Sequence, residues 1–185
     1  MADKNAYREF LKQDLGGLID ALALSDLQKH SLRSRWLDQV LWMEGRADHA
    51  RNRYYLFRLT TIILGVIIPV LVGLNIEGPI GAILRYGIVV LGLLVAITAS
   101  LEEFFRYGER WRHYRQTVEW LKIEGWRFFQ LSDPYRKYKT HPEAYPIFAD
   151  RVEDLLRQDV NVYVSEIVRS KEGKEADKEE EGAKK

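Results

Sequence analysis

The chain has 185 residues, 30% of them charged, with no cysteine and a formal net charge of +1. The lack of cysteine excludes disulfides, thiolate nucleophiles and cysteine-ligated zinc, and the small net charge says nothing about partners. These averages describe an ordinary soluble domain. They conceal that the apolar residues are gathered in two runs near the middle of the chain.

Residues 1–24 predict an amphipathic helix. Apolar residues recur at helical spacing over 5–23, although the pair Gly16-Gly17 costs about 1 kcal/mol per glycine relative to alanine. The polar face carries Asp14 and Asp20 and is not basic. Packing on the protein's own helices is therefore favoured over binding to a membrane surface.

A capping box, Ser25 with Gln28, opens the next helix. An apolar stripe then continues without a helix breaker into the first apolar run, so one long helix is expected from about Asp26 to Ile76. The stripe follows steps of four and three residues and consists of Leu32, Trp36, Val40, Met43, Ala47, Ala50 and Tyr54.

The two apolar runs are long enough to cross a bilayer. Leu59 to Ile76 contains 18 residues without a charge, which span about 27 Å as a helix. The second run covers about 80–101 if the Arg85 side chain extends outward and places its guanidinium in the aqueous boundary of the bilayer. The first run begins past residue 55, so it is not a cleavable signal peptide. Two core helices of a soluble domain are the alternative, but the rest of the chain has too little apolar surface to cover them.

Charge sets the expected topology. Arginines flank both runs on the sides away from the short connection 77–85, and the positive-inside rule places those flanks, and both termini, in the cytoplasm. Aromatic residues at the ends of the runs agree with membrane boundaries. The arginines are Arg46, Arg51, Arg53 and Arg58 before the first run, and Arg106, Arg110, Arg112 and Arg115 after the second.

The second run continues into a helix with a 3-4 apolar repeat that ends near 131. We predict a heptad seam that meets a long partner helix, either its copy in another subunit or the first long helix. The second pairing, antiparallel and within one chain, is favoured because a parallel dimer would set arginine against arginine. The seam residues are Val90, Leu93, Ile97, Ser100, Phe104, Tyr107, Trp111, Tyr114, Val118, Leu121, Gly125 and Phe128.

Another capping box, at Thr140 with Glu143, opens a last helix within residues 132–169. Its apolar face, from Tyr145 to Ile167, is expected to cover aromatic residues that lie off the seam. Residues 170–185 have no large apolar side chain and are expected to be disordered. The aromatics to be covered are Phe105, Trp120, Trp126 and Phe129.

The motifs of catalysis and of cofactor binding are missing from the sequence. The four histidines form no zinc pattern, and no phosphate-binding or nucleophile-elbow motif occurs. Adjacent carboxylates such as Glu102-Glu103 point in different directions on a helix and make a poor acid–base pair. We therefore expect no enzyme, no metal, no cofactor and no nucleic-acid partner.

Small and polar residues inside the two runs are the candidates for function. They repeat every four residues, a pattern that lets helices approach closely; one face could serve the hairpin and the other a neighbouring subunit or a pore. Carboxylates at the ends of the runs would favour cations at pore mouths. Candidates for pore lining or packing are Thr61, Gly65, Pro69, Gly73, Gly92, Ala96 and Ser100; candidates for pore mouths are Asn75, Glu77, Glu102 and Glu103.

The order of these features resembles the SLATT superfamily, bacterial membrane proteins with two spans and helical cytoplasmic flanks. The resemblance covers roughly 30–168. It implies a pore-forming effector, since members are proposed to act so, often beside sensors of nucleotide signals; no sensor domain is fused in this sequence. The matching residues are Arg51-Asn52-Arg53-Tyr54-Tyr55, Pro69, Arg110-Trp111-Arg112-His113-Tyr114-Arg115, Trp120-Leu121-Lys122-Ile123-Glu124 and Phe148-Ala149-Asp150-Arg151-Val152-Glu153.

The sequence therefore predicts an all-α membrane protein, a two-span helical hairpin with long cytoplasmic helical extensions. Its expected parts are 1–24, the hairpin 25–131 with spans about 59–76 and 80–101, the helix within 132–169 and the tail 170–185. We expect a homo-oligomeric channel of the cell membrane that conducts cations, with lipid, ions and copies of itself as partners. The alternative is a non-conducting anchor or scaffold whose cytoplasmic helices bind a partner protein.

Overall fold

A computed structural model of the chain describes residues 2–74 and 76–160. Helices connected by short turns make up this part of the chain, and no strand occurs in it, which confirms the all-α prediction. The elements are α1 (Ala2–Ala21), α2 (Asp26–Ser31), the π-helix η1 (Leu32–Leu37), α3 (Asp38–Gly73), α4 (Gly78–Phe105), α5 (Tyr107–Phe129), the 3-10 turn η2 (Tyr135–Lys137) and a helix over 141–160.

The chain divides into two compact units. Met1–Leu41 and Thr117–Lys185 form one, here called the terminal unit, and Trp42–Gln116 forms the other, the central unit. Two helices run through both units, since α3 begins in the terminal unit and α5 ends in it. The units do not coincide with the four segments expected from the sequence.

The first long helix forms as predicted. The Ser25 hydroxyl accepts the Gln28 N–H at 3.3 Å, and the Gln28 side chain accepts the Ser25 N–H at 3.1 Å, which completes the capping box. The helix then runs unbroken from Asp26 to Gly73, with η1 as a wider turn inside it and Pro69 within α3. Every apolar stripe residue from Leu32 to Ala50 is buried.

The core of the terminal unit is aromatic. The Trp36 indole N–H donates to the Leu121 carbonyl at 2.8 Å, and the Trp36 ring packs edge-on against Phe129 and Phe148. Phe128 stacks on Phe148 with ring centroids 4.4 Å apart. The helix over 141–160 therefore covers the seam residue Phe128.

Within the described residues, the off-seam aromatics are not covered by the last helix as predicted. Phe129 lies beside Trp36, but Trp120 and Trp126 stay 39% and 45% exposed within the chain. Phe105 lies in the central unit and stacks on Tyr107. Tyr163 and Ile167 of the predicted apolar face, and the predicted disordered tail 170–185, lie outside the described residues.

Helix α1 packs on the chain itself, as its acidic polar face predicted. Leu15 and Ile19 are buried, and α1 contacts η1. The Arg33 guanidinium donates to the Gly16 carbonyl at 3.3 Å and pairs with the Asp20 carboxylate. Further towards the N-terminus the apolar face is open, since Phe10 is 62% exposed.

The predicted second long helix is broken at Arg106. This residue adopts a left-handed conformation, with φ 48 and ψ 44, and separates α4 from α5. The break rotates the contact face of α4, so the seam predicted from α5 does not continue into it: Leu93 is 61% and Phe104 70% exposed. The predicted seam residues Val90, Ile97 and Ser100 are exposed as well.

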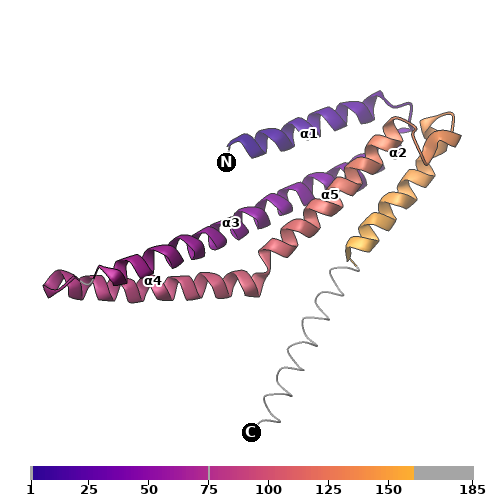
Figure 1. The fold of residues 1–185 in the computed structure, drawn as a ribbon. Coiled ribbons are helices and arrows are strands. Elements are labelled where there is room, and N and C mark those ends of the chain that lie inside the picture. The colour runs from indigo at the N-terminus through magenta and orange to yellow at the C-terminus, as the bar shows by residue number, and fades with distance from the viewer. Residues whose placement is uncertain (1, 75, 161–185) are drawn as a thin grey trace, which may run out of the picture. The chain divides into compact units, whose positions relative to one another are not determined.

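Two glycines make the turn between α3 and α4. Gly78 has φ 84, a conformation that favours glycine. A Cβ on Gly81 would lie 1.9 Å from the Ile76 carbonyl oxygen, so only glycine fits at that point. Figure 1 shows the last part of α3 and α4 side by side and antiparallel beyond this turn.

Candidate functional site

The apolar residues of the hairpin lie on its outside. Here the hairpin means Leu59–Gly73 of α3 with Ile80–Leu101 of α4, its turn end lies at Glu77, and its open end lies at Arg58 and Glu102. Val66 is 65% and Ile83 is 73% exposed. Two helical stretches are long and apolar enough to cross a membrane: Asp26–Gly73, and Gly78–Phe129 with the break at Arg106 inside it. None of the most apolar part of the first stretch is buried. An apolar surface of this extent needs a cover of lipid or protein.

One line of less exposed side chains joins the two helices of the hairpin. Thr61 and Thr98 meet on it, with hydroxyl oxygens 3.3 Å apart. Each hydroxyl also bonds a carbonyl one turn back on its own helix, Thr61 to Phe57 and Thr98 to Leu94. The pairing within one chain is thus antiparallel as predicted, in a register that the sequence did not reveal. The line consists of Phe57, Thr61, Leu64, Ile68 and Leu71 on α3, and Leu84, Ile88, Leu91, Val95 and Thr98 on α4.

The small-residue stripes face away from this contact line. A Cβ added to Gly65, Gly73 or Gly92 would meet no atom within 4 Å. Pro69, Ala96 and Ser100 are exposed. Of the seven candidates for lining or packing, Thr61 alone takes part in the hairpin contact within the described residues.

At the turn end, Glu77 is exposed and precedes α4, where its side chain caps no backbone N–H. The second candidate there, Asn75, lies outside the described residues. Glu77 therefore stays a candidate for a pore mouth, exposed beside the end of the apolar region.

At the open end, Glu102 and Glu103 line a cleft of about 550 Å³. The same cleft contains the arginines Arg58, Arg106 and Arg112, so charges of both signs line it. Arg106 donates to Glu109 at 2.7 Å, whereas Arg58, Arg112, Glu102 and Glu103 form no ion pair within the described residues. The lining consists of Tyr54, Arg58, Thr61, Ala99, Glu102, Glu103, Arg106, Gly108, Glu109 and Arg112.

The break at Arg106 shapes this cleft. Its N–H donates to the Glu102 carbonyl and ends α4, and α5 starts in a new direction. Gly108 then lies against Tyr54, where an added Cβ would stand 2.9 Å from a ring carbon. The sequence does not predict that Arg58 and Arg112 meet in this cleft, because the left-handed conformation of Arg106 has no sequence signal.

Aromatic rings gather beside the cleft. Tyr54 stacks on Trp111 at 6.3 Å between centroids, and Phe57 lies 5.8 Å from Tyr107. These rings come from α3 and α5, at the boundary where the apolar hairpin gives way to charged helices. The position matches that of aromatic residues at a membrane–water interface.

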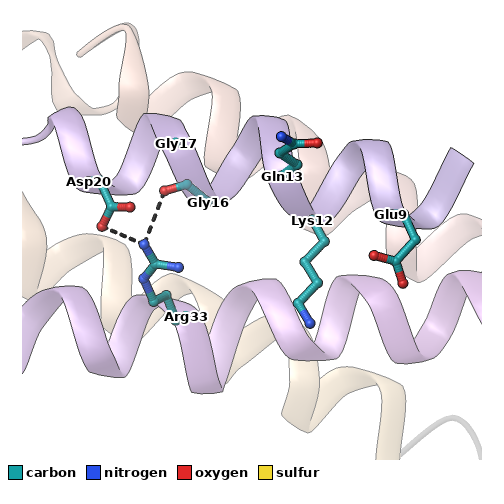
Figure 2. A pocket seen from close by; sticks show the side chains of 7 residues that line it. All are labelled: Glu9, Lys12, Gln13, Gly16, Gly17, Asp20 and Arg33. Atoms are coloured by element: carbon teal, nitrogen blue, oxygen red, sulfur yellow. Dashed lines mark hydrogen bonds and ion pairs between the residues drawn. The ribbon is translucent and has the colours of Figure 1, made fainter. Parts of the chain in front are cut away.

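A second groove lies in the terminal unit, between α1 and η1 (Figure 2). It encloses about 460 Å³, and its charged groups have both signs. Arg33 is held there by the Gly16 carbonyl and the Asp20 carboxylate. In turn, the hydrogen bond from the Arg33 guanidinium holds the pKa of Asp20 below its usual value. The groove is open, and Arg33 at its centre already pairs with Asp20. We therefore interpret it as a contact between two helices and assign no ligand to it. Its lining is Glu9, Lys12, Gln13, Gly16, Gly17, Asp20 and Arg33.

The terminal unit also contains a buried ionic network that the sequence did not indicate. Glu124 is 3% exposed and accepts two hydrogen bonds from Arg151, at 2.5 and 3.1 Å. The Tyr135 hydroxyl donates to the same carboxylate. Burial raises the pKa of Tyr135, and the bond to Glu124 raises it further. Hydrogen bonds to the Glu124 carboxylate therefore connect α5 with η2, through Tyr135, and with the helix over 141–160, through Arg151.

Among the described residues, no group of three His, Cys, Asp or Glu side chains could hold a metal ion. A family model with the description "protein of unknown function (DUF4231)" matches residues 38–143, more than half of the chain. The chain belongs to the DUF4231 family. No match was found among curated proteins or among solved structures. The DUF4231 match begins at the first residue of α3 and includes the hairpin, its cleft and all of α5.

Proposed function

We propose that the hairpin crosses the cell membrane twice, with both termini in the cytoplasm. The observation that carries this proposal is the exposure of large apolar side chains all along two helices of sufficient length. Water would be a poor solvent for this surface, while the hydrocarbon core of a bilayer fits it in chemistry and in length.

Charge and aromatic residues support the orientation. Four arginines lie in the flank 46–58 before the first apolar run and four in the flank 106–115 after the second, whereas the connection 77–85 contains only Arg85. Short basic flanks stay in the cytoplasm. The aromatic rings around Tyr54 and Trp111 lie at the open end, where the cytoplasmic interface would be.

We further propose that several copies form a cation channel. The contact line inside one hairpin is filled by leucine, isoleucine and threonine side chains, so a water path requires more than one chain. Gly65, Gly73 and Gly92 leave room on outward faces for a close helix–helix approach between subunits. The resemblance to the SLATT superfamily, whose members are proposed to form pores, supports the same assembly.

Glu77 is the carboxylate best suited to attract cations in this channel. It is exposed at the turn end, within three residues of the apolar region. A ring of such carboxylates at a pore mouth raises the local cation concentration. Glu102 and Glu103 share their cleft with unpaired arginines, which offset their field.

The second candidate is a membrane anchor that binds a partner protein. The exposed apolar side chains Trp120, Ile123 and Trp126 on the terminal unit favour it, because large exposed aromatic residues are typical of protein interfaces. Symmetry separates the two functions. A channel requires a ring with a polar axis, whereas an anchor has no such requirement.

The test starts from detergent-solubilised full-length protein. Particle images should show a closed ring, and planar bilayers that contain the protein should pass a cation current. Rings that pass no current at any voltage would refute conduction and favour the anchor. Protein that stays soluble after cell lysis without detergent would refute membrane insertion itself.

A further inference from the structure

Within the part of the chain that the structure describes, the cleft at the open end presents unpaired charges of both signs. Arg58 comes from α3, Glu102 and Glu103 from α4, and Arg112 from α5. Arg106 and Glu109 of the same cleft do form an ion pair, so pairing occurs there where the geometry allows it. Three separate helices hold the remaining two cations and two anions apart, and leave their hydrogen-bonding capacity for a ligand.

The cleft also lies at a defined depth of the hairpin. Arg58 immediately precedes the uncharged run that begins at Leu59, and Glu102 immediately follows Leu101. If the hairpin spans the bilayer, as proposed above, the cleft is level with the lipid headgroups. Thr61 and Ala99 on its lining belong to the two uncharged runs and so lie on the acyl side of that level.

We propose that this cleft binds the headgroup of phosphatidylethanolamine. The Arg58 and Arg112 guanidiniums donate to the phosphate, which they match in shape and charge. The Glu102 and Glu103 carboxylates accept hydrogen bonds from the primary ammonium. The inference rests on the membrane insertion proposed above and adds a specific lipid to it.

The chemistry of the lining discriminates between headgroups. Phosphatidylcholine has a quaternary ammonium without N–H groups, so the two carboxylates gain no hydrogen bonds from it. Phosphatidylglycerol has the phosphate but no cation, and would leave both carboxylates beside an anion. Phosphatidylethanolamine offers a hydrogen-bonding partner to all four side chains, the phosphate to the two arginines and the primary ammonium to the two glutamates. This assignment takes Glu102 and Glu103 away from any pore mouth and leaves Glu77 there.

Native mass spectrometry of the full-length protein, released from detergent with one defined lipid at a time, measures this preference. Phosphatidylethanolamine should bind about tenfold more tightly than phosphatidylcholine or phosphatidylglycerol, the difference expected for losing one charge-assisted contact. Equal binding of the three lipids would overturn the proposal. Tighter binding of phosphatidylglycerol would also overturn it and define a simple anion site.

Paired variants separate the two halves of the site. Arg112→Gln should weaken phosphatidylethanolamine binding by about tenfold, whereas Arg110→Gln, two residues away on α5 and outside the cleft lining, should not. The double variant Glu102→Gln with Glu103→Gln should remove the preference over phosphatidylcholine. Glu77→Gln at the turn end is its control. The melting temperature of each variant must stay at the wild-type value. Where Arg112→Gln alters it, Arg112→Lys is used in its place. The expected loss of lipid affinity is then smaller, because lysine keeps the positive charge but lacks the two-pronged guanidinium.

Soluble phosphoethanolamine carries the same charged groups and serves as the competing source. At concentrations equal to the lipid it should not displace bound phosphatidylethanolamine, because it lacks the acyl chains that dissolve beside the apolar hairpin. Full displacement would overturn a lipid ligand. Protein that extracts with detergent yet shows no lipid preference would refute this inference alone and leave membrane insertion intact.

Discussion

Gly125 of α5 lies directly against the indole of Trp36, and a Cβ added to Gly125 would stand 2.0 Å from Cζ2 of that ring. Trp36 is 1% exposed and anchored by its bond to the Leu121 carbonyl, so the ring has no room to move aside. The close approach of these two helices in the terminal unit therefore depends on this glycine.

Gly125→Ala should destabilise the protein by about 1–3 kcal/mol, the range for overpacking a filled core. Urea unfolding of the solubilised protein, followed by helical circular dichroism, measures the change. Gly17→Ala is the matched control, since its Cβ meets nothing within 4 Å in α1. It should stabilise the protein by up to about 1 kcal/mol through helix propensity. Equal effects at both positions would contradict the packing described.

Arg151→Met should destabilise the protein at neutral pH and less so in acid. Burial alone raises the pKa of Glu124, but the bonds from Arg151 and Tyr135 outweigh it and hold that pKa below its ordinary value of 4.5. A depressed carboxyl pKa stabilises the folded state above about pH 4.5, and this stability is lost as the pH falls through the folded-state pKa. We expect a loss of about 1–3 kcal/mol at pH 7, reduced from the fully buried case because Arg151 is 42% exposed.

Urea unfolding at pH 7 and at pH 4 checks this prediction. The difference between wild type and Arg151→Met should shrink at the lower pH, because pH 4 lies below the ordinary pKa of 4.5, where Glu124 of the unfolded chain binds a proton. Arg157→Met is the control, because Arg157 is 72% exposed and, among the described residues, forms an ion pair with Asp154 on its own helix. A loss that does not depend on pH would show that Arg151 acts through packing alone.

The sequence predicted the helices well, since apolar spacing and capping residues are local signals. The burial from Leu32 to Ala50 and the capping box at Ser25 follow from them. It failed at Arg106, because one left-handed residue rotates all of α4 and depends on tertiary packing around Gly108 and Tyr54. The cleft forms only because of this break in the helix. The sequence therefore places Arg58, Arg112, Glu102 and Glu103 beside the apolar runs, but it does not predict that they line one cleft.

Trp111→Ala should destabilise the central unit. The ring stacks on Tyr54 and lies 6.0 Å from Tyr55, so its loss leaves a gap between α5 and α3. Truncating a buried tryptophan costs about 3–5 kcal/mol, and the lower end applies because the ring is only half-buried. Thermal unfolding in detergent measures the effect. An unchanged melting temperature would show that Trp111 makes no stabilising contact with α3.

Reporters at three positions test the proposed topology. Fusions before Met1 and after Lys185 should both be cytoplasmic, and a tag inserted after Glu77 should be reached from outside by an impermeant label. The asymmetry of arginine between the flanks and the connection 77–85 is the physical reason. Opposite locations of the two termini would rule out the hairpin topology.

Glu77→Gln should lower cation conductance in planar bilayers. If subunits surround a pore, their Glu77 carboxylates lie at one mouth and concentrate cations there. The decrease should be largest at low ionic strength, where the Debye length is about 30 Å at 0.01 M and the charge is least screened. Glu180→Gln is the control, because it makes the same chemical change far from Glu77 in the sequence, in a segment outside the described residues. It should leave the conductance unchanged. Single-channel recordings at two salt concentrations distinguish a lost surface charge, which salt restores, from a damaged pore, which it does not. A Glu77→Gln channel with wild-type conductance at low salt would exclude Glu77 from the conduction path, and Gly65 and Gly92 on the outward faces would become the positions to test next.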